Sequence, residues 1–387
     1  MAWQVYQLTG SALDLGLVGL FQFLPRIALT PFAGHLADRH NRRRIAVIAQ
    51  TIQALVLVVL CAASFEHLAT RELLFILVFI SGAARTYEGP ATQAMLPAVV
   101  PLSMFARAVA VNASAIQAAT LIAPAVAGGL YIVGATAAYG VTAALYAAAA
   151  LAMQAVPFKA QPVGASSGFV ASFVEGLRFM RGRPIILGAI SLDMFAVLLG
   201  GATAVLPIIA DTLLHAGSIG LGLLRSAPAV GALAMSIWLA HHPMRSAVGQ
   251  RMFAAVAVFG LATIALAFSR SLALSLVILF ALGAADMVSV VIRQAMVQLH
   301  TPDAMRGRVS AVNSIFIGAS NQLGEFESGL TAAWFGLVPS IVIGGVGTLL
   351  VTVLWMRLFP SLARAQTLEA APAGSGAPAG QGATKAD

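Results

Sequence analysis

Long apolar stretches recur along the whole chain, separated by short polar segments. A run of ~18 or more apolar residues can cross a bilayer, and there the backbone satisfies its own hydrogen bonds by forming a helix. The period-two alternation over ~10 residues that marks membrane-barrel strands is missing. We therefore predict about eleven membrane-spanning helices, which we place approximately at Leu15–Ala33, Ile45–Ser64, Leu73–Leu96, Ala108–Tyr131, Ala135–Val156, Ile185–Ala210, Leu221–Ala240, Met252–Phe268, Leu272–Leu299, Val309–Thr331 and Leu337–Leu358.

Two segments do not fit this pattern. Pro157–Pro184 joins the fifth and sixth predicted spans, and within it Phe169–Met180 gathers its apolar side chains on one helical face. Such a helix is typical of one that lies on the membrane surface. After Pro360 the chain becomes rich in Ala, Gly and Pro, so we expect a disordered tail.

Composition supports the prediction of an integral membrane protein. Hydrophobic residues make up 59% of the chain and charged residues only 9%, against about 25% charged in soluble proteins. The net charge of +8 is typical of the Lys and Arg bias of cytoplasmic loops and gives no reason to expect a nucleic-acid partner. The chain shows neither metal-ligand spacing among its histidines nor a phosphate-binding glycine loop. We therefore predict no metal, no cofactor and no enzymatic activity.

The basic residues also predict the orientation. If the loop with Arg39, Arg42, Arg43 and Arg44 is cytoplasmic and the spans alternate from there, almost all loop Lys and Arg are inside. The amino terminus is then outside and the carboxyl terminus inside. We expect a multi-pass protein of the inner (cytoplasmic) membrane.

An internal repeat is visible in the sequence. Gly82–Asn112 aligns with Gly283–Asn313 at an offset of 201 residues, with 12 of 31 positions identical. A weaker match at an offset of 203 pairs Gly19, Leu20 and Pro25 with Gly222, Leu223 and Pro228. Parallel repeats of this kind are a known transporter design.

The repeat predicts two helical halves in the same orientation, with a first half one helix short. The segment from Trp3 to Tyr6 would be the outer end of the missing first helix. The predicted fold is an all-α polytopic membrane protein with two pseudo-repeats. Its parts are a first half at 1–156, a linker at 157–184, a second half at 185–360 and a tail at 361–387.

Three motifs carry a family resemblance that covers about residues 1–360. The sequence from Gly34 to Arg43 resembles the loop signature of the major facilitator superfamily, G-x-L-A-D-R-x-x-R-R. Arg85–Gly89 resembles the R-x-x-Q-G motif of helix 4, with Glu in place of Gln. Pro124, with Gly128 and Gly129, resembles the antiporter motif of helix 5.

The sequences of Gln4–Ser11 and Thr301–Val309 resemble those of the bacterial exporter branch that includes enterobactin exporters. The resemblance implies proton-driven export by alternating access. It also implies that Gly34, Asp38, Arg39, Arg42 and Arg43 form a cytoplasmic latch that controls conformation; the same arginines also serve as a topology signal.

Ionisable residues inside the predicted spans are candidates for the chemistry, because burying a charge in a bilayer is costly. Arg85 and Glu88 are three residues apart and can meet on one helical face, either as a proton-exchanging pair or as a permanent structural ion pair. Asp193 and Asp286 lie on predicted helices 7 and 10, which line the cavity in the resembled family. Burial lets a carboxyl group exchange its proton near neutral pH.

Other intramembrane charges have simpler explanations. Asp286 can pair with Arg293, two turns further on. Glu325 and Glu327 point in different directions and can face water at the membrane surface, although Glu325 remains a coupling candidate. Arg26 and Arg225 can pair or reach the interface, and we assign them no role.

Pro124, Gly128 and Gly129 need no chemistry. Small residues let helices approach closely and Pro bends a helix, which suits either a rocking bundle or plain packing.

We expect a monomeric, proton-coupled exporter of a small amphipathic molecule, drug-like or siderophore-like. Its partners would be the substrate, protons and the lipid bilayer. Two alternatives remain, namely a non-transporting relative and an importer.

Overall fold

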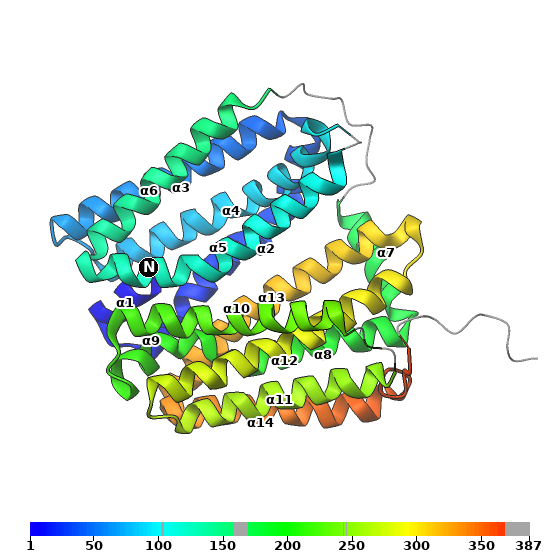
Figure 1. The fold of residues 1–387 in the computed structure, drawn as a ribbon. Coiled ribbons are helices and arrows are strands. Elements are labelled where there is room, and N and C mark those ends of the chain that lie inside the picture. Colours follow the sequence, from blue (N-terminus) through cyan, green and yellow to red (C-terminus); the bar gives the residue numbers. More distant parts are fainter. Residues whose placement is uncertain (102–103, 158–168, 243, 245, 368–387) are drawn as a thin grey trace, which may run out of the picture.

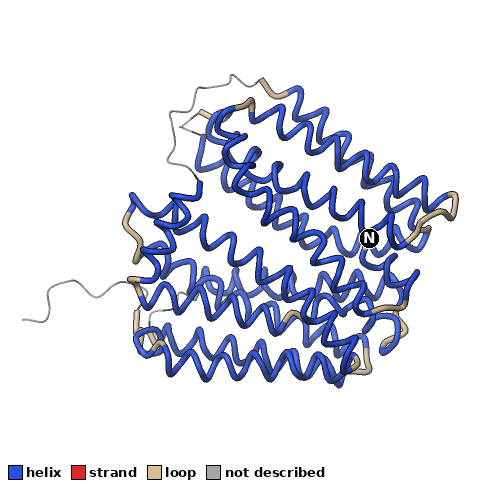
Figure 2. Tube along the Cα trace, turned by 180° about the vertical axis from the view of Figure 1, so that it is seen from behind, coloured by secondary structure: helices blue, strands red, loops and turns tan. Residues whose placement is uncertain are grey.

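The computed structural model describes residues 1–101, 104–157, 169–242, 244 and 246–367, and these residues form helices and short connections without a strand (Figure 1; Figure 2). The all-α prediction is confirmed. The elements are α1 (Ala2–Thr9), α2 (Ala12–Arg39), α3 (Arg42–Phe65), α4 (Arg71–Val99), α5 (Phe105–Val133), α6 (Ala135–Ala155), α7 (Phe169–Arg181), α8 (Pro184–Gly200), the 3₁₀ helix η2 (Ala202–Val205), α9 (Leu206–Ile208), the π-helix η3 (Ile209–Leu213), α10 (Gly217–His241), α11 (Val248–Phe268), α12 (Leu272–Leu299), α13 (Asp303–Phe335), α14 (Leu337–Leu358) and α15 (Pro360–Ala363).

Local sequence sets several helix starts. The Ser11 hydroxyl accepts a hydrogen bond from the Asp14 N–H (3.2 Å) at the start of α2. The side chains of Asn41 and Thr70 cap α3 and α4 in the same way. Such caps satisfy N–H groups that the first turn of a helix leaves unpaired. They explain why the predicted spans begin close to the observed helices.

The helices form two halves that pack alike. In the first half α2 packs on α4 and α3 on α6; in the second half α10 packs on α12 and α11 on α14. These pairs are equivalent under the repeat seen in the sequence. A repeated glycine lies in the α2–α4 contact and in the α10–α12 contact. A methyl group on Gly82 would meet the backbone of Gln22, and one on Gly283 would meet the backbone of Pro228.

Nine helices are long and apolar enough to cross a membrane by length and composition, when only the described residues are searched. Of the predicted spans, α4 and α13 do not reach this threshold. Both are long helices of the bundle, 29 and 33 residues, and both carry charged side chains in their middle parts.

The predicted span Ile185–Ala210 is not one continuous helix. The α-helix stops at Gly200, and 3₁₀ and π geometry continue the segment as far as Leu213. Paired glycines and Pro207 explain the break, because Gly weakens a helix interior and Pro removes a hydrogen bond. The Gly201 carbonyl instead accepts a hydrogen bond from the Ser328 hydroxyl (3.1 Å).

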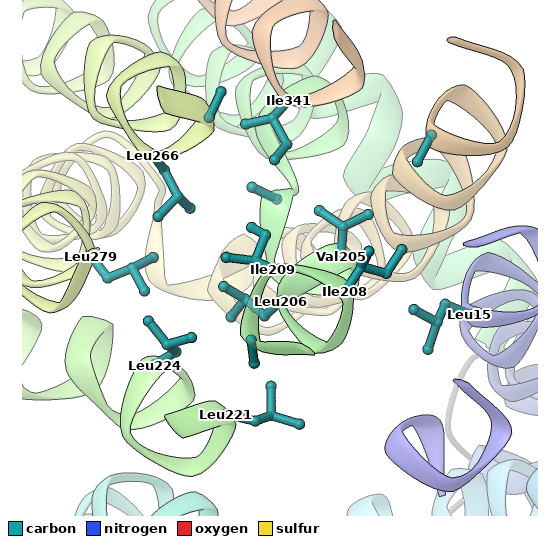
Figure 3. Close-up of a cluster of buried hydrophobic side chains, with 14 of the residues drawn as sticks. Leu15, Val205, Leu206, Ile208, Ile209, Leu221, Leu224, Leu266, Leu279 and Ile341 are labelled. Atoms are coloured by element: carbon teal, nitrogen blue, oxygen red, sulfur yellow. The ribbon is translucent and has the colours of Figure 1, made fainter. Parts of the chain in front are cut away.

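The outer part of this interrupted helix is the centre of an apolar cluster. Val205, Leu206 and Ile209 are fully buried, and side chains from α2, α10, α11, α12 and α14 surround them (Figure 3). This cluster fills the end of the molecule at which the two halves meet.

The linker helix α7 was predicted at Phe169–Met180 and is observed at Phe169–Arg181. Its apolar side chains pack on the second half: Met180 is fully buried beside Val309 and Val312 of α13, and Leu177 packs on the same cluster. Protein therefore covers the described part of this apolar face.

The described part of the predicted tail also packs on the second half. Leu362 in α15 is buried, and the Gly249 N–H donates to the Ala365 carbonyl (3.0 Å). Residues 368–387 of the predicted tail lie outside the described residues.

The two halves lie close together at the end that carries α1 and α9, and they diverge toward the end that carries α7 (Figure 1; Figure 2). Their contacts follow two seams, α2 with α13 and α5 with α10. Under the repeat these seams are also equivalent. Trp3–Tyr6 lies in α1; its assignment as the outer end of a longer first helix stays a prediction.

Candidate substrate and proton site

Glycines allow the closest approach in both seams between the halves. A methyl group on Gly128 of α5 would lie 2.5 Å from the Ser218 carbonyl oxygen on α10, and one on Gly329 of α13 would lie 2.5 Å from the Gly16 Cα on α2. Gly128 and Gly329 are 201 residues apart, the offset of the repeat. Among the described atoms, nothing lies within 4 Å of a methyl group on Gly129. Of the two predicted packing glycines, the structure therefore places only Gly128 in a tight contact.

A cavity of about 580 Å³ lies between the seams. Helices α5, α8, α10, α12 and α13 line it, and most of the lining is apolar or small. A few polar side chains interrupt it: Gln117, Thr120, Thr203, Arg225, Asp286, Asn321 and Glu325. Its size and chemistry are those of a small-molecule site, which is mostly apolar with a few placed polar groups.

A second cavity of about 510 Å³ adjoins the first and shares Pro124, Arg225 and Glu325 with it. It extends toward the first half, where Arg85 and the aromatic side chains of Trp3, Tyr131 and Tyr139 line it. Arg225 thus reaches both cavities, although the sequence alone suggested no role for it. The signal that could have found it is a charged side chain within an apolar span.

A buried ion pair lies behind the larger cavity. Arg293 on α12 contacts the Asp193 carboxylate on α8 at 3.0 Å, and the two residues are only 3% and 5% exposed. The Arg293 guanidinium also donates to the Asn313 side chain on α13 (3.4 Å). The pair therefore connects three helices of the second half.

Asp286 stands between this ion pair and the cavity. It precedes Arg293 by seven residues, about two turns of α12, and is within electrostatic reach of both Asp193 and Arg293. Asp193 and Asp286 also line one small void together. The structure thus brings the three residues together, but Arg293 pairs with Asp193 and not with Asp286, the partner that the sequence suggested.

The predicted contact between Arg85 and Glu88 is not formed. Glu88 accepts a hydrogen bond from the Gln50 side chain of α3 (3.1 Å), whereas Arg85 is exposed and lines the second cavity. Glu88 is therefore bonded to Gln50 on the neighbouring helix and not to Arg85, three residues away on its own helix. Under the repeat Arg85 is the equivalent of Asp286, so the two halves present opposite charges at matched positions.

Glu325 packs against the first half. A methyl group on Gly19 of α2 would lie 2.9 Å from a Glu325 carboxylate oxygen. The carboxylate is within electrostatic reach of Arg225, but within the described ranges the two form no ion pair. Glu325 thus lies where a seam between the halves meets both cavities.

The predicted latch is described only in part. The surroundings of Gly34 and the side chains of Asp38 and Arg39 lie outside what the structure describes. Arg43, at the start of α3, donates to the carbonyl oxygens of Val156 (2.8 Å) and Gln154 (3.4 Å) near the end of α6. This contact is within the first half, and the latch stays a prediction.

Two helical halves around a central cavity, with buried charges at its wall, define a transporter of the major facilitator fold. Comparison with known proteins gives the family. The family described as transmembrane secretion effector matches residues 1–374, and the chain belongs to it, within the major facilitator superfamily.

Relatives and solved structures agree with this assignment. The chain is 26% identical over 376 residues to the enterobactin exporter EntS of Citrobacter koseri, covering 94% of this chain and 85% of that protein. It is 29% identical over 177 residues to the macrolide efflux protein A of Streptococcus pyogenes, covering 45% and 44%.

Among solved structures, an inward-facing, unoccupied bacterial homologue of the human lysosomal transporter Spinster superposes with a TM-score of 0.74 at 15% identity, over 96% of this chain and 94% of that one. The nucleoside transporter NupG gives a TM-score of 0.68 at 14% identity, over 92% of this chain and 93% of that one. The predicted major facilitator fold and membership of the exporter branch are confirmed.

Proposed function

We propose that this protein is a proton-coupled exporter of a small amphipathic molecule across the inner membrane. The observation that carries the proposal is the group formed by Asp193, Asp286 and Arg293 at the wall of the cavity. The similarity to an enterobactin exporter and a macrolide efflux protein supports export as the direction.

The charges of this group favour the binding of one proton. Two carboxylates and one guanidinium leave one negative charge without a partner. An uncompensated charge in apolar surroundings is costly, and a proton removes the cost. Asp193 already holds Arg293, and Asp286 borders the cavity, so Asp286 is the carboxyl that we expect to take up and release the proton.

The proposed cycle alternates between an inward-open and an outward-open arrangement of the halves. In the orientation predicted from Lys and Arg, the wide, α7 end would face the cytoplasm, and we therefore assign this arrangement to the inward-open form. Here Asp286 releases its proton to the cytoplasm, and its carboxylate then competes with Asp193 for Arg293. Substrate enters the cavity, the halves rock about the glycine seams, and Asp286 is protonated again from outside.

Inverted membrane vesicles test this function directly. Respiration acidifies their interior, and an exporter then accumulates substrate that is added outside. Enterobactin and erythromycin, a macrolide, are the probes, and each is measured in the filtered vesicles. We expect gradient-dependent accumulation of at least one of them.

A protonophore should abolish that accumulation, while vesicles without the protein give the background. Accumulation that survives the protonophore would contradict proton coupling. Gradient-driven loss of probe from preloaded vesicles would indicate an importer, and an absence of flux in both directions would favour the non-transporting alternative.

A further inference from the structure

We infer that the two adjoining cavities bind an aromatic organic anion, with Arg225 and Arg85 as the groups that hold its acidic end. This inference names the substrate class of the proposed transporter and rests on that proposed function. It starts from Arg225, whose side chain lines both cavities.

The Arg225 guanidinium is presented to the cavities without a partner. Its side chain is exposed, although the residue lies in the middle of the apolar helix α10. In the part of the chain that the structure describes, Arg225 forms neither an ion pair nor a hydrogen bond. A guanidinium offers planar, bidentate donors that match a carboxylate, so an anionic ligand would supply the missing partner.

The neighbouring polar groups of the second cavity are also donors. Arg85, from the first half, is exposed and likewise has no ion pair or hydrogen bond among the described residues. The Trp3 indole N–H is buried at the same cavity without an acceptor in the described ranges. Tyr131 and Tyr139 already donate their hydroxyls to Gln7 and Gln4.

Glu325 is the carboxylate of the protein that would compete with a bound anion for the Arg225 guanidinium. Its carboxylate is half-buried against Gly19 and is within electrostatic reach of the guanidinium, yet it forms no ion pair with it in the described structure. A bound anion would compete with this carboxylate, and removal of the Glu325 charge should therefore tighten anion binding.

The remaining walls define the rest of the ligand. The rings of Trp3, Tyr131 and Tyr139 line the second cavity together with small apolar side chains of α5. These surfaces suit a flat aromatic body, because aromatic rings pack well on one another. In a ligand with an acidic group on an aromatic body, the acidic group would thus contact the arginines and the body would contact the aromatic rings.

The test is equilibrium binding of matched probes to the purified full chain in detergent micelles. The probes are 2-naphthoate, the cation 2-naphthylmethylammonium and the neutral 2-naphthylmethanol, measured by equilibrium dialysis against empty micelles. We expect the wild-type protein to bind the anion about 10-fold more tightly than the cation, since one charge-assisted hydrogen-bonded contact accounts for about that factor.

Variants assign the effect to the guanidinium. Arg225→Gln should weaken naphthoate binding about 10-fold and leave the neutral probe unchanged. Arg225→Lys should lose less, and Glu325→Gln should bind naphthoate more tightly. Arg26→Gln is the matched control, because Arg26 is an intramembrane arginine that lies against Gly318 and not among the lining residues of either cavity.

Unchanged naphthoate affinity in a monodisperse Arg225→Gln protein would overturn the inference, as would preference for the cation or no naphthoate binding by the wild type. The assay uses no gradient, so its outcome is separate from that of the vesicle experiment. Anion binding without flux would count against the proposed transport alone, and flux without anion preference against this inference alone.

Discussion

The two halves share their packing but differ in their charges. Gly82 and Gly283 sit at matched helix contacts, and both are followed by Ala-Ala and then by an ionisable residue, Arg85 in the first half and Asp286 in the second. Neutral hydrogen bonds, such as the Ser81 hydroxyl to the Gln53 side chain (2.7 Å), hold the first half at this level. An ion pair holds the second.

This difference shows which properties a repeated sequence conserves. Residues that let two backbones approach are constrained in both copies, because a larger side chain would separate the helices. Side chains that face the cavity are free of that constraint. At the matched cavity positions the second half has an acid, Asp286, and the first half has a cation, Arg85.

The largest difference between the halves should appear in stability. Arg293→Gln leaves Asp193 buried without its counter-ion, which should cost about 3–5 kcal/mol. Arg85→Gln removes an exposed group with no ion pair among the described residues and should cost less than about 0.5 kcal/mol. The thermal unfolding midpoint of the purified proteins measures both.

Equal losses of stability in Arg293→Gln and Arg85→Gln would contradict this difference between the halves. The deficit of Arg293→Gln should also shrink as the pH falls, because protonation of Asp193 removes the unpaired charge.

The next contrast concerns coupling. Asp286→Asn cannot exchange a proton, so gradient-driven accumulation in inverted vesicles should be lost. Glu88→Gln keeps the oxygen that accepts from Gln50, and flux should stay close to that of the wild type. Matched amounts of protein in the membrane are the control. Wild-type flux in Asp286→Asn would remove this residue from the mechanism.

The two seams between the halves should lose similar stability when their glycines are replaced by alanine. Gly128→Ala and Gly329→Ala each place a methyl group 2.5 Å from backbone of the other half, so each should cost about 1–3 kcal/mol. Gly129→Ala is the neighbouring control. A lower unfolding midpoint for only one of the two seam variants would show that the halves are not held symmetrically.

The smallest effect should come from the exposed ion pair of the linker helix α7. Glu175 and Arg308 form an exposed ion pair (2.7 Å) between α7 and α13, and Glu175→Gln should cost less than about 1 kcal/mol. Met180→Ala removes a fully buried side chain and should cost about 2–5 kcal/mol. A reversed order would mean that charge, and not apolar packing, fixes α7 to the second half.

The sequence predicted the helices well because each apolar run is bounded by a cap, a glycine or a charged loop. It missed the break at Gly200, since the residues beyond it are as apolar as those before it. It also missed the Gln50 partner of Glu88, because spacing along one helix says nothing about a neighbouring helix. Arg225 was assigned no role for the same reason: only the fold shows that this side chain faces a cavity.

The break between α8 and η2 gives helix 7 a fulcrum near its midpoint. Asp193 and its ion pair lie on the inner arm, and the residues that pack on α2 and in the apolar cluster of Figure 3 lie on the outer arm. Because no continuous α-helix joins the two arms, a movement of the outer arm would not have to be transmitted to the Asp193–Arg293 pair. In the proposed cycle, the state of the charged group would then depend on the proton and not on the position of the outer arm.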